Sequence, residues 1–285
     1  MKKYKAAICA LAAALLMLSA CDPAPSPGVS ASPPPPSGVA SPGIPEPVQP
    51  SVSPAPPQSP EPPSPSPVRD ISEDWQDNGL DVSNISFAKT YGDSSSPVLD
   101  ASAAFPQTGV AGIDQYFSFC RDDFERRADG MSSEAAQAVQ NGYGPYSFDS
   151  DYNVECSSGG IFSVSRRASE YTGGVHGMTF VFCENFSVST GRLLTLDDFF
   201  TVDQPAYTAR LVGELHRLID AYPGELFGQE SKDIVEQAFP YDSFVVTKDG
   251  LSFIFEPYRI GPYSAGIVRL DIGWAAIYDI WQTPA

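Results

Sequence analysis

Apolar and polar residues follow two kinds of pattern along most of the chain after its first quarter. Residues 82–90 and 97–105 alternate with period two and predict two strands. Residues 109–129 predict a helix, because apolar side chains recur there three and four positions apart. The positions that form this helical stripe are Ile113, Tyr116, Phe117, Cys120 and Phe124.

A second short helix is expected over residues 132–140, with Ser132 or Ser133 as its amino-terminal cap. The period then changes from helical to alternating. Turns at 157–160 and 172–177 separate three alternating stretches, which predict a meander of strands. These stretches are 146–156, 161–171 and 178–189.

The clearest helical pattern of the chain covers residues 206–222 and ends before Pro223-Gly224. Residues 244–247 and 251–255 predict a hairpin, and residues 267–272 predict the last strand. Helices and strands follow one another without regular alternation. This order favours an α+β fold over a doubly wound parallel sheet.

Composition sets the first quarter of the chain apart from this folded part. Residues 22–68 contain 19 of the 28 prolines and almost no large apolar side chains. Such a segment cannot bury a core, so we expect a disordered but extended spacer, up to roughly 145 Å long as polyproline II. The folded part then comprises two small mixed α/β subdomains with antiparallel sheets, at residues 69–145 and 146–285.

The first 20 residues have the features of an export signal. Three lysines precede an apolar run over residues 6–17 that is too short to span a bilayer. The following Leu18-Ser19-Ala20-Cys21 resembles the lipobox of bacterial lipoproteins. That resemblance implies that Cys21 becomes the mature amino terminus and carries acyl chains on its sulfur and its amine. The protein is then expected on the extracellular face of the cell membrane, anchored in the lipid bilayer.

The charge of the chain is strongly acidic, with a formal net charge of −18 at pH 7. Residues 1–68 hold three lysines and three acidic residues, so the whole net charge belongs to the folded part. Such a surface repels nucleic acid and attracts cations and basic proteins. Acidic charge also keeps an exported protein soluble, and this simpler account stays open.

Three cysteines remain in the folded part once Cys9 leaves with the signal peptide and Cys21 is acylated. Cys120 lies in a predicted helix, whereas Cys156 and Cys183 lie in predicted strands. An odd number of cysteines is compatible with one disulfide and one buried thiol, or with three buried thiols.

Sequence patterns of enzyme and metal sites are missing from the chain. Its only histidines are His176 and His216, and no phosphate-binding glycine loop, nucleophile elbow or zinc motif is present. Residues 149–160 begin like a calcium loop but have Val154 and Gly160 where such a loop needs glycine and glutamate. On a strand, the polar residues of this segment would line one solvated face. We therefore expect no enzyme activity, catalytic residue, metal or cofactor.

A set of motifs in the second half is similar to a known family. It comprises Gly173-Gly174-Val175-His176, the segment STGRLLTLDDFF at 189–200 and the segment FEPYRIGPYSAG at 255–266. In this order they resemble the C-terminal extracellular domain of RsiV-type anti-sigma factors, which also occurs in PdaC-type peptidoglycan deacetylases. Phe105-Pro106-Gln107-Thr108-Gly109 resembles the start of the companion domain, so the resemblance extends over residues 83–281.

The resemblance implies a shared extracellular module more than a shared activity. We expect a lipid anchor in place of the sigma-binding segment and membrane helix of the anti-sigma factors, and we expect no deacetylase domain after the module. Neither activity is therefore expected. In the anti-sigma factors the module binds lysozyme, a strongly basic protein, and an acidic domain suits such a partner.

Four residues are candidates for a binding site. Tyr258, Pro262 and Tyr263 lie in one loop after a strand, where tyrosines are good anchors for protein or sugar contacts. A tyrosine beside a proline is also found at corners packed on a core, so this alternative stays open. His176 lies in an exposed glycine-rich turn and is the fourth candidate.

These observations favour a surface-anchored lipoprotein that binds an envelope macromolecule, with a lysozyme-like protein or cell-wall glycan as leading partners. The alternatives are a wall-modifying hydrolase or deacetylase-like enzyme with an unrecognised site, and a passive structural lipoprotein.

Overall fold

The structure, a computed structural model, describes residues 75–284. The signal peptide, Cys21 and the proline-rich spacer that the sequence predicts lie outside the described residues. The described residues all belong to one compact unit of the chain. None of their helices is both long and apolar enough to cross a membrane.

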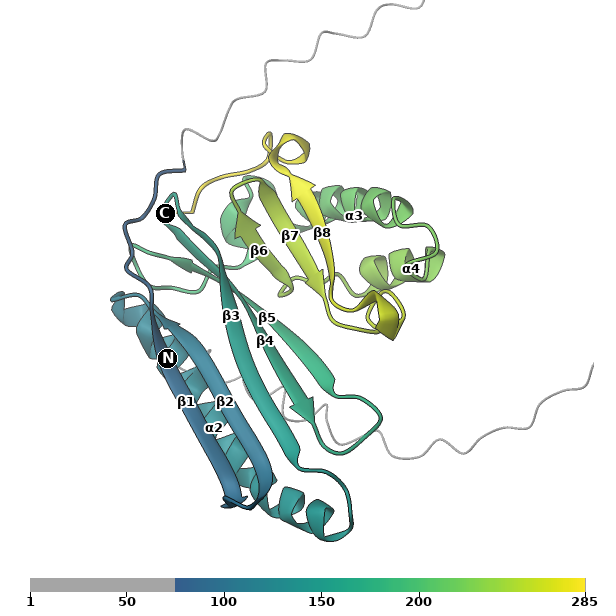
Figure 1. Ribbon diagram of the computed structural model, residues 1–285. Coiled ribbons are helices and arrows are strands. Elements are labelled where there is room, and N and C mark those ends of the chain that lie inside the picture. Colours follow the sequence, from purple (N-terminus) through teal and green to yellow (C-terminus); the bar gives the residue numbers. More distant parts are fainter. Residues whose placement is uncertain (1–74, 285) are drawn as a thin grey trace, which may run out of the picture. The chain divides into compact units, whose positions relative to one another are not determined.

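A five-stranded sheet forms the first part of the fold (Figure 1). Its strands, in spatial order, are β1 (Ser83–Asp93), β2 (Ser96–Gln107), β3 (Tyr146–Ser158), β4 (Ile161–Tyr171) and β5 (Met178–Ser187). Neighbours are antiparallel except for β2 and β3, which are parallel. A parallel pair needs a crossover connection, and α2 (Ala111–Gln140) provides it. The predicted meander is confirmed, since β3, β4 and β5 pair in order.

The long helix α2 covers one face of this sheet and buries a hydrophobic core against it (Figure 1). The sequence prediction of two helices is wrong, because α2 continues through Gly130. Ala128 and Ala135 on either side are fully buried, and their packing offsets the roughly 1 kcal/mol that a glycine costs inside a helix. The Ser132 hydroxyl donates to the Asp129 carbonyl at 2.7 Å within the helix instead of capping a new one.

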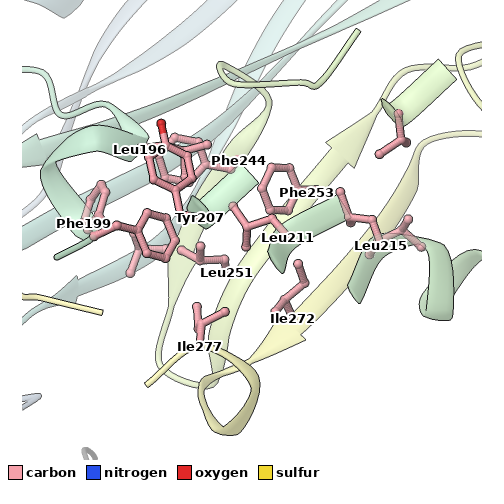
Figure 2. Close-up of a cluster of buried hydrophobic side chains, with 14 of the residues drawn as sticks. Leu196, Phe199, Tyr207, Leu211, Leu215, Phe244, Leu251, Phe253, Ile272 and Ile277 are labelled. Carbon is pink, nitrogen blue, oxygen red and sulfur yellow. The ribbon is translucent and has the colours of Figure 1, made fainter. Parts of the chain in front are cut away.

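A second, three-stranded sheet and two helices form the rest of the fold. The strands are β6 (Phe244–Thr247), β7 (Gly250–Phe255) and β8 (Val268–Gly273), and the helices are α3 (Gln204–Asp220) and α4 (Gln229–Gln237). Short 3-10 turns are η3 (Leu196–Phe199), η4 (Tyr263–Ala265) and η5 (Trp274–Ala276). Figure 2 shows the core between α3 and this sheet, where Leu211 and Leu215 of α3 meet Leu251 and Phe253. The predicted helix, hairpin and last strand are thus confirmed.

Helix α4 has no counterpart in the sequence prediction. Only Ser231 and Val235 of its nine residues are buried, so it has no apolar stripe that a periodicity could reveal. The Ser231 hydroxyl donates to the carbonyl of Ile260 at 2.6 Å in the interior. This tertiary hydrogen bond connects α4 to the chain that follows β7.

Asn185 on β5 takes the place of a neighbouring strand for β6, and so joins the two sheets. Its Nδ2 donates to the Phe244 carbonyl at 2.9 Å, and its Oδ1 accepts from the Val246 amide at 3.1 Å. The Ser163 hydroxyl also accepts from the Val246 amide, at 2.9 Å, and donates to Asn185 Oδ1 at 2.6 Å. Asn185 and Ser163 are fully buried, and they satisfy backbone groups that would otherwise be unpaired there.

The mixed helix and strand content and the two mostly antiparallel sheets confirm the α+β prediction. The five-stranded sheet continues across residue 145, where the sequence analysis divided the folded part, because β2 and β3 are paired neighbours. Strands from both sides of that position therefore share one hydrophobic core with α2.

Candidate binding surface

Three of the four candidate residues meet in one exposed cluster, although they come from loops far apart in the sequence. His176 lies in the turn between β4 and β5, and its ring stacks on that of Tyr263 with centroids 4.3 Å apart and planes inclined by 25°. The ring of Tyr258 lies 6.2 Å from His176 and 5.4 Å from Tyr263. The Tyr258 hydroxyl is 3.5 Å from His176 Nε2. We call His176, Tyr258 and Tyr263 the aromatic cluster.

The fourth candidate, Pro262, shapes the loop and adds no ring to the cluster. It precedes η4 with φ −65°, and its carbonyl accepts a hydrogen bond from the Ala265 amide at 2.9 Å. Pro262 is partly buried, whereas Tyr263 directly after it is exposed. The fixed φ of proline therefore sets the direction in which the chain presents Tyr263.

Tyr258 has an unusual backbone conformation. Its φ of 69° is the only positive value at a non-glycine residue within 75–284. A bulky residue in this region is strained by roughly 1–3 kcal/mol, and such residues concentrate at functional sites. The side chain is 54% exposed, so burial does not compensate for the strain.

Glu256 fixes the base of the loop that carries Tyr258. Its Oε1 accepts a hydrogen bond from the backbone amide of Val181 on β5 at 2.9 Å. β5 is the last strand of its sheet, so the carboxylate pairs an edge amide. The contact holds the Tyr258 loop beside the strand that follows His176.

Further apolar side chains are exposed around the cluster. Val175 is completely exposed next to His176, and Met178 is 53% exposed at the start of β5. Tyr143 is also exposed, and its side chain lies against Gly173 in the same turn. Together with the aromatic cluster, Val175, Met178 and Tyr143 form what we call the aromatic patch. Exposed apolar side chains that include several tyrosines are typical of interaction sites.

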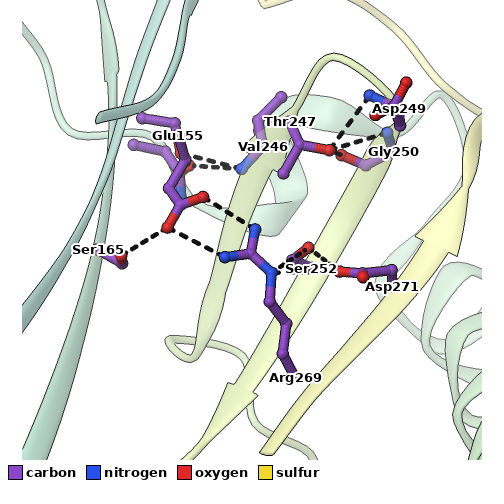
Figure 3. A network of polar contacts seen from close by, with 11 residues as sticks. Glu155, Ser165, Val246, Thr247, Asp249, Gly250, Ser252, Arg269 and Asp271 are labelled. Carbon is purple, nitrogen blue, oxygen red and sulfur yellow. Dashed lines mark hydrogen bonds and ion pairs between the residues drawn. The ribbon is translucent and has the colours of Figure 1, made fainter. Parts of the chain in front are cut away.

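A second feature is a groove of about 540 Å³ between the two sheets. Its lining residues come from β3, β4, β5, β7 and β8 and from the segment just before β8. Figure 3 shows its central ion pair, in which Arg269 on β8 binds both carboxylate oxygens of Glu155 on β3, at 3.1 and 2.9 Å. The Ser165 hydroxyl donates to Glu155 at 2.6 Å, and Arg269 Nε donates to Ser252 Oγ at 3.0 Å. Asp271 completes the network through contacts with Ser252 and Arg269.

A buried ion pair lies on the opposite face of the five-stranded sheet, under α2. Arg166 donates to Glu184 through Nε at 3.0 Å and through Nη2 at 2.7 Å, and both side chains are almost fully buried. Arg166 also lies over the Phe182 ring at 4.5 Å. The sequence shows no sign of this pair. Arg166 and Glu184 lie on different strands, and only the pairing register of those strands brings the two side chains together.

The three cysteines of the described part are free thiols. The disulfide that the sequence left open is absent, because β4 lies between the strands that carry Cys156 and Cys183. Burial raises the pKa of the Cys120 and Cys156 thiols to about 11. Burial also raises the pKa of Cys183 above its ordinary value.

The segment that resembled a calcium loop, residues 149–160, forms most of β3 and the turn after it. Asp149, Asp151 and Asn153 share one face of the sheet, as expected for alternate strand positions. Glu155 is the extra residue of a β-bulge between Val154 and Cys156. Among the described residues, no group of three or more histidine, cysteine or acidic side chains could hold a metal ion.

Comparison with known proteins places the second part of the fold in context. Residues 197–275, from η3 to η5, match the family "Protein of unknown function (DUF3298)". Two solved DUF3298 structures are similar, and at their sequence identities the likeness shows the fold alone. One, from Bacteroides fragilis NCTC 9343, has a TM-score of 0.53 and 19% identity, and the match covers 73% of this chain and 96% of that protein.

The other, from Pseudomonas aeruginosa PAO1, has a TM-score of 0.52 and 16% identity, with 73% and 99% covered. A comparison with curated proteins finds no match. Tyr258 and Tyr263 lie inside the matched segment and His176 lies before it. Residues 197–275 are therefore similar to the DUF3298 family, and the fold is similar to that of two solved DUF3298 proteins.

Proposed function

We propose that the protein is a surface-anchored lipoprotein that binds a basic protein of the lysozyme kind through its aromatic patch. The observation that carries this proposal is the exposed stack of His176 on Tyr263, with the strained Tyr258 beside it. We propose binding and not catalysis, because the aromatic cluster offers exposed ring faces and a tyrosine hydroxyl, which are contact groups at protein interfaces.

Ring stacking supports a recognition role for the patch. Three rings that are already ordered lose little conformational freedom when a partner covers them. Tyrosine is among the residues that dominate binding energy at protein interfaces. The face of an aromatic ring also attracts the ammonium and guanidinium groups of a basic partner.

Charge supports the choice of a basic partner. The net charge of −18 attracts a cationic protein over distances of about a Debye length, roughly 10 Å at 0.1 M salt. The resemblance to the RsiV-type extracellular domain points to lysozyme in particular. The proposed anchor at Cys21 would hold the patch outside the cell, where such a partner is met.

Calorimetric titration of the full chain with lysozyme tests the proposal. We expect binding that weakens but persists from 50 to 300 mM salt, and that cytochrome c, also basic, does not reproduce. Tyr258→Ala and Tyr263→Ala should each weaken binding by about 1–2 kcal/mol, which is roughly five- to thirtyfold. Tyr222→Ala is the matched control, because Tyr222 is 39% exposed just beyond the end of α3 and outside the patch.

Melting temperatures decide how a loss of binding is interpreted. A patch variant that binds weakly but melts like the unmodified protein supports a direct contact, whereas a fall in melting temperature would mean that the substitution disturbs the fold and that the loss of binding is indirect. Absence of heat with lysozyme at low salt would refute the proposal. Retention of the protein on insoluble cell wall would then favour the glycan as partner.

A further inference from the structure

The groove between the two sheets has two chemically different walls. Asp151, Asn153 and Arg167 on β3 and β4 form a polar wall. Ile267 before β8, which is 39% exposed, supplies most of the apolar surface on the other side, and Ile254 on β7 adds a smaller part because it is 6% exposed. Its volume of about 540 Å³ lies within the range of roughly 300–1,000 Å³ that small-ligand sites occupy.

The floor of the groove is fixed by the ion pair of Glu155 and Arg269. Because Glu155 is the extra residue of a β-bulge, it does not pair in the ladder with β4. Bulges commonly redirect a side chain next to a functional site. Hydrogen bonds from Ser165 to Glu155 and from Arg269 to Ser252 hold both partners of the pair in one geometry (Figure 3).

Charges in the groove compensate one another. Arg167 donates to Asp151 at 2.5 Å, and Arg269 is paired with Glu155. A cationic or an anionic ligand would have to compete with a partner already in place, either at the exposed pair of Asp151 and Arg167 or at the less exposed pair of Glu155 and Arg269. The groove therefore favours an uncharged ligand, in a protein whose surface is otherwise acidic.

Polar groups in the groove offer donors and acceptors side by side. The Asn153 side chain is exposed in the groove and forms no hydrogen bond with any other described residue. Its amide supplies two donors and one acceptor, and the neighbouring Asp151 and Arg167 add acceptors and donors. A hydroxyl group both donates and accepts, so adjacent hydroxyls on one ligand match this set. The apolar side chains opposite suit the carbon-bound hydrogens of a sugar ring.

We propose that the groove between the sheets is a binding site for a short neutral saccharide. Asn153, Asp151 and Arg167 bind the hydroxyl groups, and Ile254 and Ile267 pack against the ring. The site is separate from the aromatic patch, and the proposal does not depend on the proposed protein partner.

Titration calorimetry of the full chain with chitotetraose and cellotetraose tests this site. We expect at least one of the two to bind, and Asn153→Ala and Arg167→Ala each to weaken that binding about tenfold or more. Arg126→Ala is the matched control, since Arg126 forms an exposed ion pair with Asp123 on α2, outside the groove. Citrate and tetralysine serve as anionic and cationic probes, and neither should displace the sugar.

Each other outcome overturns the proposal. No binding of either tetrasaccharide at 10 mM would exclude a neutral saccharide site. Binding that survives both groove variants would place the sugar elsewhere, and binding lost in Tyr263→Ala would place it at the aromatic patch. Displacement by citrate or tetralysine would show that the groove prefers a charged ligand. Unchanged melting temperatures of the variants exclude unfolding as the cause of a loss.

Discussion

Asn185→Asp should make the stability of this protein strongly dependent on pH. In the structure Asn185 Nδ2 donates to the Phe244 carbonyl, and Oδ1 accepts from the Val246 amide and the Ser163 hydroxyl. A carboxylate keeps the accepting oxygen but places a second, negatively charged oxygen against the Phe244 carbonyl. Protonation of that second oxygen would restore a donor for the carbonyl.

The size of the effect follows from burial, since Asn185 is 1% exposed. A carboxyl group in such a site has its pKa raised by about 3 units or more above the unfolded value of about 3.9. Each unit corresponds to about 1.4 kcal/mol, so the charged form destabilises the fold by about 4 kcal/mol. The folded pKa lies above the unfolded one. The variant should therefore be least perturbed below about pH 4 and lose stability as the pH rises towards 7.

Urea unfolding followed by tryptophan fluorescence at several pH values between 4 and 8 measures this loss. The difference in unfolding free energy between Asn185→Asp and the unmodified protein should grow by about 1.4 kcal/mol per pH unit. Asn153→Asp is the matched control, because it makes the same chemical change at an exposed position of β3. If Asn185→Asp matched the unmodified protein at pH 7, the amide would not be joining the two sheets.

Three further predictions concern other parts of the molecule. Glu256→Ala should weaken lysozyme binding about as much as Tyr258→Ala in calorimetry, whereas Glu256→Gln should preserve it, because a glutamine oxygen can still accept from the Val181 amide. Iodoacetamide at pH 7.5 should alkylate Cys120 and Cys156 at least about a hundredfold more slowly in the native protein than in urea, because their raised pKa keeps them protonated as thiols. Peptide mass spectrometry measures the alkylation of each cysteine. Cys21→Ala should leave an unprocessed precursor or release the protein from membranes, and unchanged fractionation of a fully processed form would contradict the lipid anchor.

Short apolar or alternating runs bounded by turn residues predicted most strands, including β4 and β6, in which consecutive residues on both faces are buried. β4 has the residues that alternation predicted, and β6 has the same bounds as the predicted strand. The local sequence did not predict the helices correctly where tertiary packing determines their bounds. The predicted helix ended at residue 129, whereas α2 continues through Gly130 because Ala128 and Ala135 are buried in the core. Helix α4 has too few buried residues to produce a stripe.

The candidate site was predictable in its members but not in its geometry. Exposed tyrosines in a proline-containing loop and a histidine in a glycine-rich turn are local signals, and they identified Tyr258, Tyr263 and His176. The stacking of His176 on Tyr263 was not predictable, because it depends on the position of the turn before β5 relative to the loop after β7. The groove was missed altogether, because Glu155 and Arg269 are 114 positions apart and only the fold brings them together. The alternating polar residues of β3 were its one signal.

The loop from Glu256 to Ile267 connects the two proposed sites physically. Its tyrosines belong to the aromatic patch, whereas Ile267 at its end lines the groove. Val181 also lines the groove, and its backbone amide donates a hydrogen bond to the Glu256 carboxylate. Removing the Glu256 carboxylate should therefore disturb both sites, whereas Asn153→Ala should affect the groove alone. Because the two sites share this loop, any change that a protein partner at the patch makes to the affinity for saccharide must be matched by an equal change that the saccharide makes to the affinity for the partner.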